Sequence, residues 1–166
     1  MHAEAFAFVQ QTLAQLPPRK RVVELGGRNF NGSIRGLFNG AEYTSVDILD
    51  GYGVDVVSDA ADYQPASPPD TVVCCEVLEH APNAGAVVHN ALRMLAPGGV
   101  LVLTCATDPR VPHSGIDGNS VRAGEHYANV PREDLARWLK GADVRVLQTQ
   151  PQGDLQCLAV KKREDA

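Results

Sequence analysis

No stretch of this chain is apolar over the eighteen or more residues that a membrane-spanning helix needs. The first helix-like stretch, 3–16, contains Glu4 and several glutamines, and it lacks the basic start and the apolar run of a signal peptide. These absences predict a cytoplasmic protein that does not insert into a membrane.

An excess of basic residues is also absent. The chain has 15 Lys and Arg against 20 Asp and Glu, which gives a formal net charge of -5. Non-specific affinity for nucleic acids comes mostly from clustered cationic side chains, so this balance argues against a nucleic-acid partner. The two short basic clusters, 19–21 and 161–163, are interpreted as solvated flanks of strands.

A Cys-x-x-Cys spacing is missing as well. Cys74, Cys75, Cys105 and Cys157 all lie in apolar, strand-like runs, which is typical of buried thiols. Neighbouring residues on a strand point to opposite faces, so Cys74 and Cys75 do not easily bind one metal together. The cysteine pattern therefore predicts no metal site.

The 166 residues are enough for one domain with a substantial core, and we expect a single domain over 1–166. Strand-like runs alternate with helical or turn-rich segments, which favours an α/β sheet. The expected strands are 21–25, 43–47, 54–58, 71–75, 100–105, 143–149 and 155–160. The link between the last two is short enough for an antiparallel hairpin but not for a parallel crossover.

Three helices are expected. Segment 84–95 has an apolar stripe that a Pro-Gly-Gly turn stops, and 131–139 has Pro131 at its expected first position. The stretch 3–16 ends at two prolines and has these apolar residues at helical spacing: Phe6, Val9, Leu13 and Leu16.

Only residues 48–53 separate the second and third expected strands, whereas a parallel crossover needs a dozen or more residues. Two alternatives follow. Either the third strand is short and reached by an irregular loop, or 54–58 is not a strand of the sheet.

The most informative stretch is 21–27, Arg-Val-Val-Glu-Leu-Gly-Gly, which Ser45-Val46-Asp47 follows about twenty residues later. The apolar residues suit a strand buried on both faces, and the two glycines allow the backbone to turn tightly and to approach a ligand. A carboxylate at the end of the second strand, Asp47, can accept hydrogen bonds from both hydroxyls of a ribose. The pattern predicts a nucleoside-binding βα unit.

Further blocks at 70–80, 92–101 and 126–131 follow these two in order and at suitable separation. Together the blocks resemble the class I S-adenosylmethionine-dependent methyltransferases, particularly the small type 11 branch, over nearly the whole chain. The resemblance implies a Rossmann-like α/β fold with a mostly parallel seven-stranded sheet and an antiparallel last strand. The helix between the second and third strands would be minimal or missing.

The resemblance also implies a binding site for the cofactor S-adenosylmethionine. The backbone of 26–32, with Gly26, Gly27 and Gly32, would wrap the methionine part, and Glu24 would lie near its amino group. Asp47 would hold the ribose.

The adenine and the other side of the cofactor would meet residues from later strand ends. Ile48 would pack on the adenine face, and Asp59 and Ala60 would meet the adenine edge. Three residues at the end of the fourth strand and directly after it would line the cofactor's other side: Cys75, Glu76 and Val77.

The glycine loop departs from the family pattern. Arg28 and Phe30 replace the second and third glycines of the usual Glu-x-Gly-x-Gly-x-Gly. Asn29, Asn31 and Gly32 can take unusual backbone angles instead, and Ser33 or Asn31 is expected to cap a short helix that runs to Phe38. Arg28 would cross the loop, reach the substrate or remain solvated.

Methyl transfer from a sulfonium is an in-line displacement, so a base is needed only when the acceptor is a hydroxyl or a protonated amine. His113 is the first candidate, because the long segment 108–129 follows the fifth strand, beyond whose carboxyl end ligands bind. His80 and His126 are the further candidates, and structural roles for each are open alternatives.

The expected acceptor is a small molecule, a sugar or a peptide. A nucleic-acid methyltransferase would show an Asn/Asp-Pro-Pro-aromatic turn after the fourth strand, where this chain has Cys-Glu-Val-Leu. Two other functions stay open: a non-catalytic nucleoside-binding or scaffold member of the same fold, and an NAD-dependent reductase. The reductase reading lacks a third glycine and a Tyr-x-x-x-Lys pair. The oligomeric state is not predicted.

Overall fold

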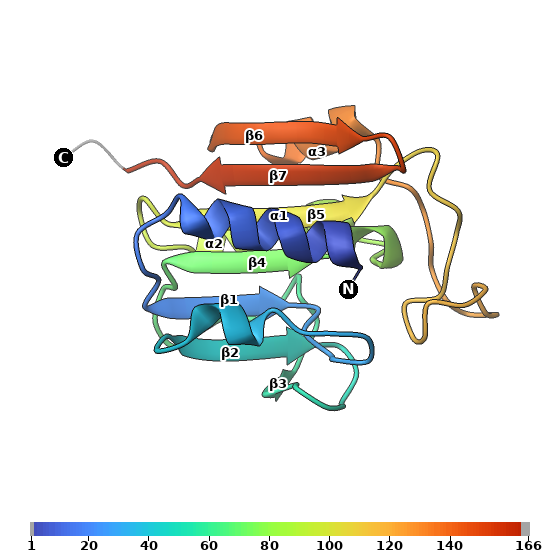
Figure 1. The fold of residues 1–166 in the computed structure, drawn as a ribbon, viewed down its shortest axis with the longest axis horizontal. Coiled ribbons are helices and arrows are strands. Elements are labelled where there is room, and N and C mark those ends of the chain that lie inside the picture. The colour runs from blue at the N-terminus through green and yellow to red at the C-terminus, as the bar shows by residue number, and fades with distance from the viewer. Residues whose placement is uncertain (1, 164–166) are drawn as a thin grey trace.

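The computed structural model describes residues 2–163, which form an α/β fold around one seven-stranded sheet (Figure 1). The strand order is β3-β2-β1-β4-β5-β7-β6, and β7 is antiparallel to both β5 and β6 while the other pairs are parallel. The strands are β1 (Arg21–Leu25), β2 (Glu42–Asp47), β3 (Val56–Val57), β4 (Thr71–Cys75), β5 (Val100–Ala106), β6 (Asp143–Gln150) and β7 (Asp154–Val160). The predicted Rossmann-like fold is confirmed.

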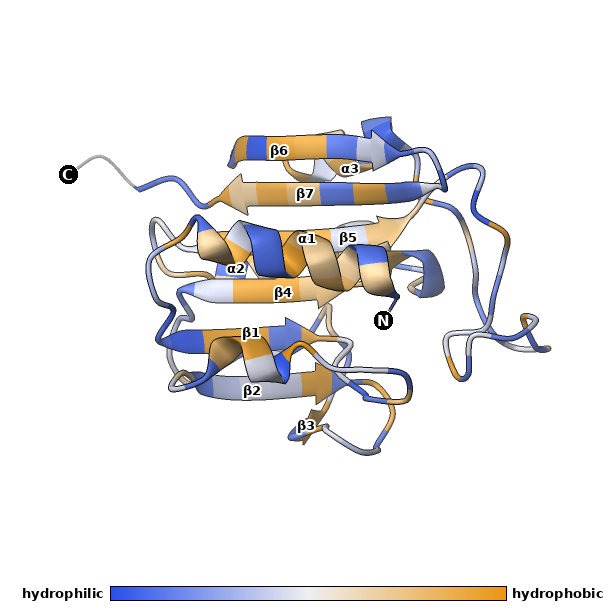
Figure 2. Cartoon of the chain, viewed as in Figure 1, coloured by the Kyte–Doolittle hydropathy of each residue, from blue (hydrophilic) through white to orange (hydrophobic). Residues whose placement is uncertain are grey.

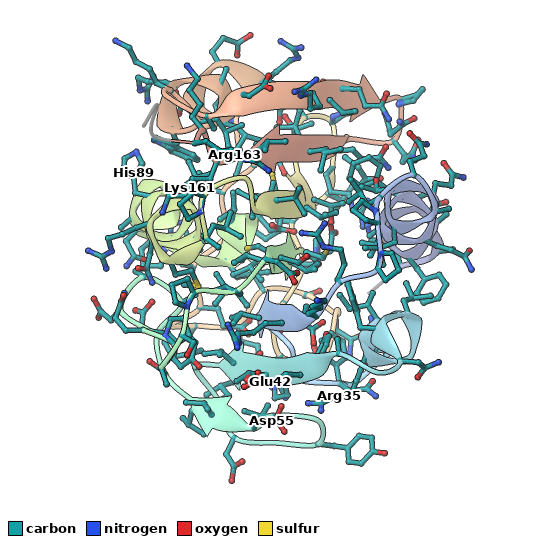
Figure 3. All side chains as sticks on the ribbon, turned by 90° about the vertical axis from the view of Figure 1, so that its left-hand side faces the viewer. Arg35, Glu42, Asp55, His89, Lys161 and Arg163 are labelled. Atoms are coloured by element: carbon teal, nitrogen blue, oxygen red, sulfur yellow. The ribbon has the colours of Figure 1, made fainter. Side chains whose placement is uncertain are left out.

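Helices cover both faces of the sheet. The helix α1 (Ala3–Ala14) and the 3-10 helix η1 (Arg35–Phe38) lie on one face, and α2 (Ala84–Met94) and α3 (Arg132–Trp138) lie on the other (Figures 1 and 3). Another 3-10 helix, η2 (Leu78–His80), follows β4. No helix among residues 2–163 combines the length and the apolar character needed to cross a membrane.

The central strands are buried on both faces. β4 and β5 are apolar at nearly every position, as Figure 2 shows, and β1 has Val22, Val23 and Leu25 among its five residues. Alternate residues serve separate cores. Val23 and Cys74 pack toward α2, and Val22 and Cys75 pack toward α1. All four cysteines are buried free thiols, as the sequence predicts.

The open question at the third strand is resolved in favour of a short strand. Val56 and Val57 pair in parallel with Val46 and Asp47, and residues 48–55, all of them described, form an irregular loop with no helix. The missing helix between β2 and β3 is therefore confirmed, while the predicted length of 54–58 is wrong.

The three predicted helices are present, but their bounds or buried faces differ from the prediction. The buried face of α1 consists of Ala5, Phe8, Val9 and Thr12, so the face that packs on the sheet is rotated from the predicted stripe. Pro131 is the residue before α3 and not its first residue, because its backbone is extended (φ -62°, ψ 139°). The short helix that ends at Phe38 is a 3-10 helix. Its N-cap is Ile34, so the predicted cap by Ser33 or Asn31 is wrong, although the Ser33 hydroxyl accepts a hydrogen bond from the Arg35 amide at 3.1 Å.

The predicted single domain over 1–166 stays a prediction, and residues 1 and 164–166 of it lie outside the described part of the chain.

The core of the sheet sets a stability test. Leu103 is fully buried in β5, so Leu103→Ala should lower the free energy of unfolding by about 2–5 kcal/mol through lost burial and a cavity. The matched control is Leu49→Ala, whose side chain is 43% exposed and should change stability by less than about 0.5 kcal/mol. Urea denaturation measures both, and equal losses would contradict the assigned core.

Candidate functional site

Two adjoining cavities open at the carboxyl ends of the parallel strands, with volumes of about 500 and 600 Å³. We call them the first and the second cavity. Segment 107–129, which extends beyond the strand ends in Figure 1, supplies part of the walls of both. Six residues line both cavities: Gly26, Arg28, Phe30, Glu76, His80 and Gly115.

All of the predicted cofactor and catalytic residues lie in these walls. Those of the first cavity are Glu24, Gly26, Gly27, Gly32, Cys75, Glu76, His80 and His113. Those of the second are Gly26, Asp47, Ile48, Asp59, Ala60, Glu76, Val77, His80 and His126. The structure thus brings the residues together, and their individual roles stay predictions.

The turn after β1 is possible only with glycine. Gly26 has a φ of +79°, and a Cβ atom there would lie 2.1 Å from the Val77 side chain. At Gly27 a Cβ would lie 2.0 Å from the Ser45 hydroxyl and 2.6 Å from a Glu24 carboxylate oxygen. The backbone is therefore pressed against the strand ends.

Glu24 is buried directly beneath this turn. Burial raises the pKa of its carboxyl, and the hydrogen bond that the Tyr43 hydroxyl donates to it at 2.7 Å works in the opposite direction. The carboxylate is thus fixed in place by β2 while one side of it faces the first cavity.

Asp47 ends β2 at the wall of the second cavity. Its two carboxylate oxygens accept hydrogen bonds from the backbone amides of Arg28 at 3.0 Å and Leu49 at 2.9 Å. Each carboxylate oxygen can accept a further bond, so the group is oriented and can still receive two hydroxyl donors. Ile48 beside it is 65% exposed, which leaves an apolar side chain available to a flat ligand.

Arg28 crosses the loop, which is one of the three positions that the sequence leaves open. Its guanidinium lies 5.5 Å from the centre of the Phe30 ring and donates to the carbonyls of Gly115 at 3.3 Å and Ile116 at 3.1 Å. The residue that replaces the second glycine thus ties the turn after β1 to segment 107–129.

Glu76 stands at the junction of the two cavities and is the one non-glycine residue with a positive φ, 58°, among the described residues. Such backbone is costly and is concentrated at functional sites. Its carboxylate accepts hydrogen bonds from the Thr104 hydroxyl and from the ring of His2, both at 2.8 Å. Burial opposes ionisation, yet these partners lower the pKa of Glu76.

Two wall residues of the first cavity, His2 and Arg110, are absent from the sequence-based site. His2 precedes α1 and comes to Glu76 from 74 positions away. Arg110 pairs with the fully buried Asp154 at 2.5 Å and lies 3.8 Å from Glu76. No local pattern marks either residue, because the contacts form only when α1, β4 and β7 are packed together.

The candidate bases differ in their surroundings. The rings of His80, His113 and Tyr127 form a cluster with centre-to-centre distances of 5.0–5.4 Å. Burial, with a smaller contribution from His113, lowers the pKa of His80, which favours the neutral imidazole at neutral pH. His126 is exposed at the wall of the second cavity, outside that cluster.

Comparison with known proteins agrees with this geometry. The methyltransferase domain family matches residues 1–149. The ubiquinone biosynthesis O-methyltransferase of Xanthomonas euvesicatoria is 33% identical over 103 residues, which are 57% of this chain and 43% of that protein. The chain thus matches less than half the length of this curated relative.

Solved structures show the same fold. The 1,6-didemethyltoxoflavin-N1-methyltransferase of Burkholderia thailandensis, with 1,6-didemethyltoxoflavin and S-adenosylhomocysteine bound, has a TM-score of 0.71 at 18% identity. That match covers 96% of this chain and 77% of the other. The N-methyltransferase NodS of Bradyrhizobium japonicum has a TM-score of 0.67 at 16% identity, with coverage of 96% and 95%. This chain belongs to the methyltransferase domain family, with the class I S-adenosylmethionine-dependent fold.

The ion pair at the cavity wall should make stability depend on pH. The hydrogen bond that the His2 ring donates to the Glu76 carboxylate raises the pKa of His2 above its ordinary 6.5. The stabilisation by this pair is therefore complete below pH 6.5 and is lost as pH rises through the folded-state pKa. The stability difference between the wild type and His2→Asn should thus be larger at about pH 6 than at about pH 9. The control His89→Asn removes an exposed imidazole on α2 and should show no such trend. Urea denaturation at both pH values tests this, and a difference that grows with pH would contradict the His2–Glu76 pair.

Proposed function

We propose that this chain transfers the methyl group of S-adenosylmethionine to a small-molecule, sugar or peptide acceptor by in-line displacement. The observation that supports the proposal most strongly is the convergence of every predicted cofactor residue on two adjoining cavities. Membership of the methyltransferase domain family supports methyl transfer as the reaction at these cavities.

The residues present suit the cofactor. The Gly26–Gly27 backbone leaves space that a Cβ atom would fill, which is what a tightly wrapped ligand requires. Asp47 and Ile48 offer the acceptor and the apolar surface that a ribose and an adenine need. We therefore assign the second cavity to the adenosine part.

The first cavity would then take the methionine part and the acceptor. Its wall holds the carboxylates of Glu24 and Glu76 together with the cations of His2 and Arg110. An amino acid group carries both charges, so this mixed wall suits it. Gly26 and His80, which line both cavities, mark the place where the methyl group would meet the acceptor.

When bound, S-adenosylmethionine supplies a methyl group on a positively charged sulfur that becomes neutral on transfer. The protein needs no acid for the leaving group, and its work is alignment and exclusion of water. Segment 107–129, held to the glycine turn by Arg28, lines the junction of the cavities through Gly115. An acceptor that loses a proton needs a base, and the proposed candidates remain His113, His80 and His126.

The net charge of the chain, the size of the first cavity and the relatives support this acceptor class. The chain is acidic overall, with a net charge of -5, which does not favour a polyanionic substrate. The relatives named above include an O-methyltransferase and N-methyltransferases, one of them with a small heterocycle bound. A compact acceptor suits the first cavity of about 500 Å³.

Titration calorimetry with S-adenosylhomocysteine tests the proposal. The wild type should bind, and Asp47→Ala should weaken binding by about 1–3 kcal/mol, or roughly 5- to 150-fold, through loss of charged hydrogen bonds. The matched control is Asp50→Ala, an exposed aspartate three residues on that does not line either cavity. Its affinity should equal that of the wild type.

The same titration separates the alternatives. A folded wild type that fails to bind S-adenosylhomocysteine would indicate the non-catalytic scaffold. Binding of NADH without binding of S-adenosylhomocysteine would indicate the reductase. Binding of S-adenosylhomocysteine with transfer of a labelled methyl group to a member of a metabolite panel would establish the activity and its acceptor.

A further inference from the structure

The carboxyl group of Glu79 is unusually placed. Its side chain is fully buried, and neither carboxyl oxygen has a partner in good hydrogen-bond geometry among residues 2–163. The backbone amides of Glu79 and Ala106 lie near this carboxyl. A buried polar group without partners costs free energy, so its presence calls for an explanation.

Two imidazoles lie close to this carboxyl. One ligand atom each of Glu79, His80 and His113 lies within 4.8 Å of the others. In a tetrahedral zinc site with bonds of about 2.1 Å, two ligand atoms are about 3.4 Å apart, so the three side chains would have to move closer together to bind one ion.

Both rings have a nitrogen available to such an ion. Nδ1 of His80 is buried and has no hydrogen-bond partner among the described residues. Nδ1 of His113 lies 3.2 Å from the carbonyl of Val111, which can only accept, so this nitrogen carries the proton and Nε2 carries the lone pair. A backbone carbonyl that fixes the tautomer in this way is the usual outer support of a metal-bound histidine.

The surrounding chain holds the rings in place. The backbone of Gly115 packs against the His80 ring, where a Cβ would lie 3.0 Å from Cγ and 3.1 Å from Nδ1. Tyr127 contacts both imidazoles edge-on, with ring centres 5.4 Å from His80 and 5.0 Å from His113. The cluster therefore consists of one buried carboxyl and two supported imidazoles, not of loose surface side chains.

We propose that Glu79, His80 and His113 bind a divalent transition-metal cation at the wall of the first cavity. Two imidazoles and one carboxylate suit Zn²⁺, Co²⁺ or Mn²⁺ better than Mg²⁺ or Ca²⁺, which favour oxygen ligands alone. Three protein ligands leave at least one position open, as in catalytic zinc sites. The site uses none of the four cysteines on which the sequence-based expectation of no metal rested.

A second cluster, His2, Glu76 and Asp154, also brings three ligand atoms together. There Arg110 already pairs with Asp154 at 2.5 Å, and its positive charge opposes a second cation. The Glu79 cluster has no such internal cation, and its carboxyl is the one without a partner.

The open position of the cation would face the acceptor, a consequence that rests on the proposed function. His80 and His113 both line the first cavity, so an acceptor hydroxyl could occupy that position. A cation lowers the pKa of a bound hydroxyl, which makes it a nucleophile near neutral pH. In this arrangement His80 and His113 act as ligands, and His126 remains the candidate base.

Titration of the chelator-treated protein with Co²⁺ tests the metal site without any methyl transfer. The wild type should bind one Co²⁺ per chain and show the visible absorption of a four- or five-coordinate ion, which excess Zn²⁺ should abolish. Loss of an outer-shell partner alone weakens metal binding by about 10- to 100-fold, so His113→Ala should weaken it by at least about 100-fold. His113 is a half-buried residue of a loop, and circular dichroism is used to check that the variant is folded.

The matched control is His89→Ala, which removes an exposed imidazole of α2 (Figure 3). His89 lines neither cavity. It should bind Co²⁺ as the wild type does. Glu79→Gln keeps the buried shape but removes the ligand charge, and it should also lose the site.

Two results would overturn the proposal: a wild type without saturable Co²⁺ binding, or undiminished binding in both His113→Ala and Glu79→Gln. Titration of the chelated protein with S-adenosylhomocysteine separates this outcome from a failure of the proposed function. A chain that binds the nucleoside but no cation loses only the metal site.

Discussion

The close approach of the Gly26–Gly27 backbone to the ends of β1 and β2 is the constraint on which the site depends. Side chains at these positions would collide with Val77, Ser45 and Glu24, so the turn exists only because no Cβ is present. The turn then presents the Arg28 amide to Asp47, which fixes that carboxylate at the wall of the second cavity. The proposed ribose contact thus depends on the backbone geometry of this turn.

The parallel strands place the rest of the site beside this turn. Because β1, β2, β4 and β5 run the same way, the residues that follow them meet at one edge of the sheet. Arg28, which stands where the family pattern has a second glycine, then joins the glycine turn to segment 107–129 through hydrogen bonds. The reduced loop between β2 and β3 leaves the second cavity bounded by Ile48, Asp59 and Ala60 without an intervening helix.

The sequence predicts the fold best at the strands that are buried on both faces of the sheet, because their apolar residues mark where each strand begins and ends. The bounds of β1 and β4 agree to the residue, because each is a short and mostly apolar run: β1 contains Val22, Val23 and Leu25, and β4 contains Val72, Val73 and two cysteines. The length of β3 could not be predicted, because a two-residue strand is defined by its partner β2 and not by its own sequence. The sequence does not predict the contacts among His2, Arg110 and Asp154 for a related reason. These contacts join segments far apart in the chain, whereas residue spacing predicts only local contacts.

The central claim is that the joined cavities receive the adenosine and methionine parts of one cofactor, and a crystal structure of the protein with S-adenosylhomocysteine tests it most directly. The account predicts the ribose hydroxyls on the Asp47 carboxylate, the adenine against Ile48 and the amino acid part along the Gly26–Gly27 turn. Density for the nucleoside elsewhere on the sheet, with Asp47 turned away from it, would contradict the account.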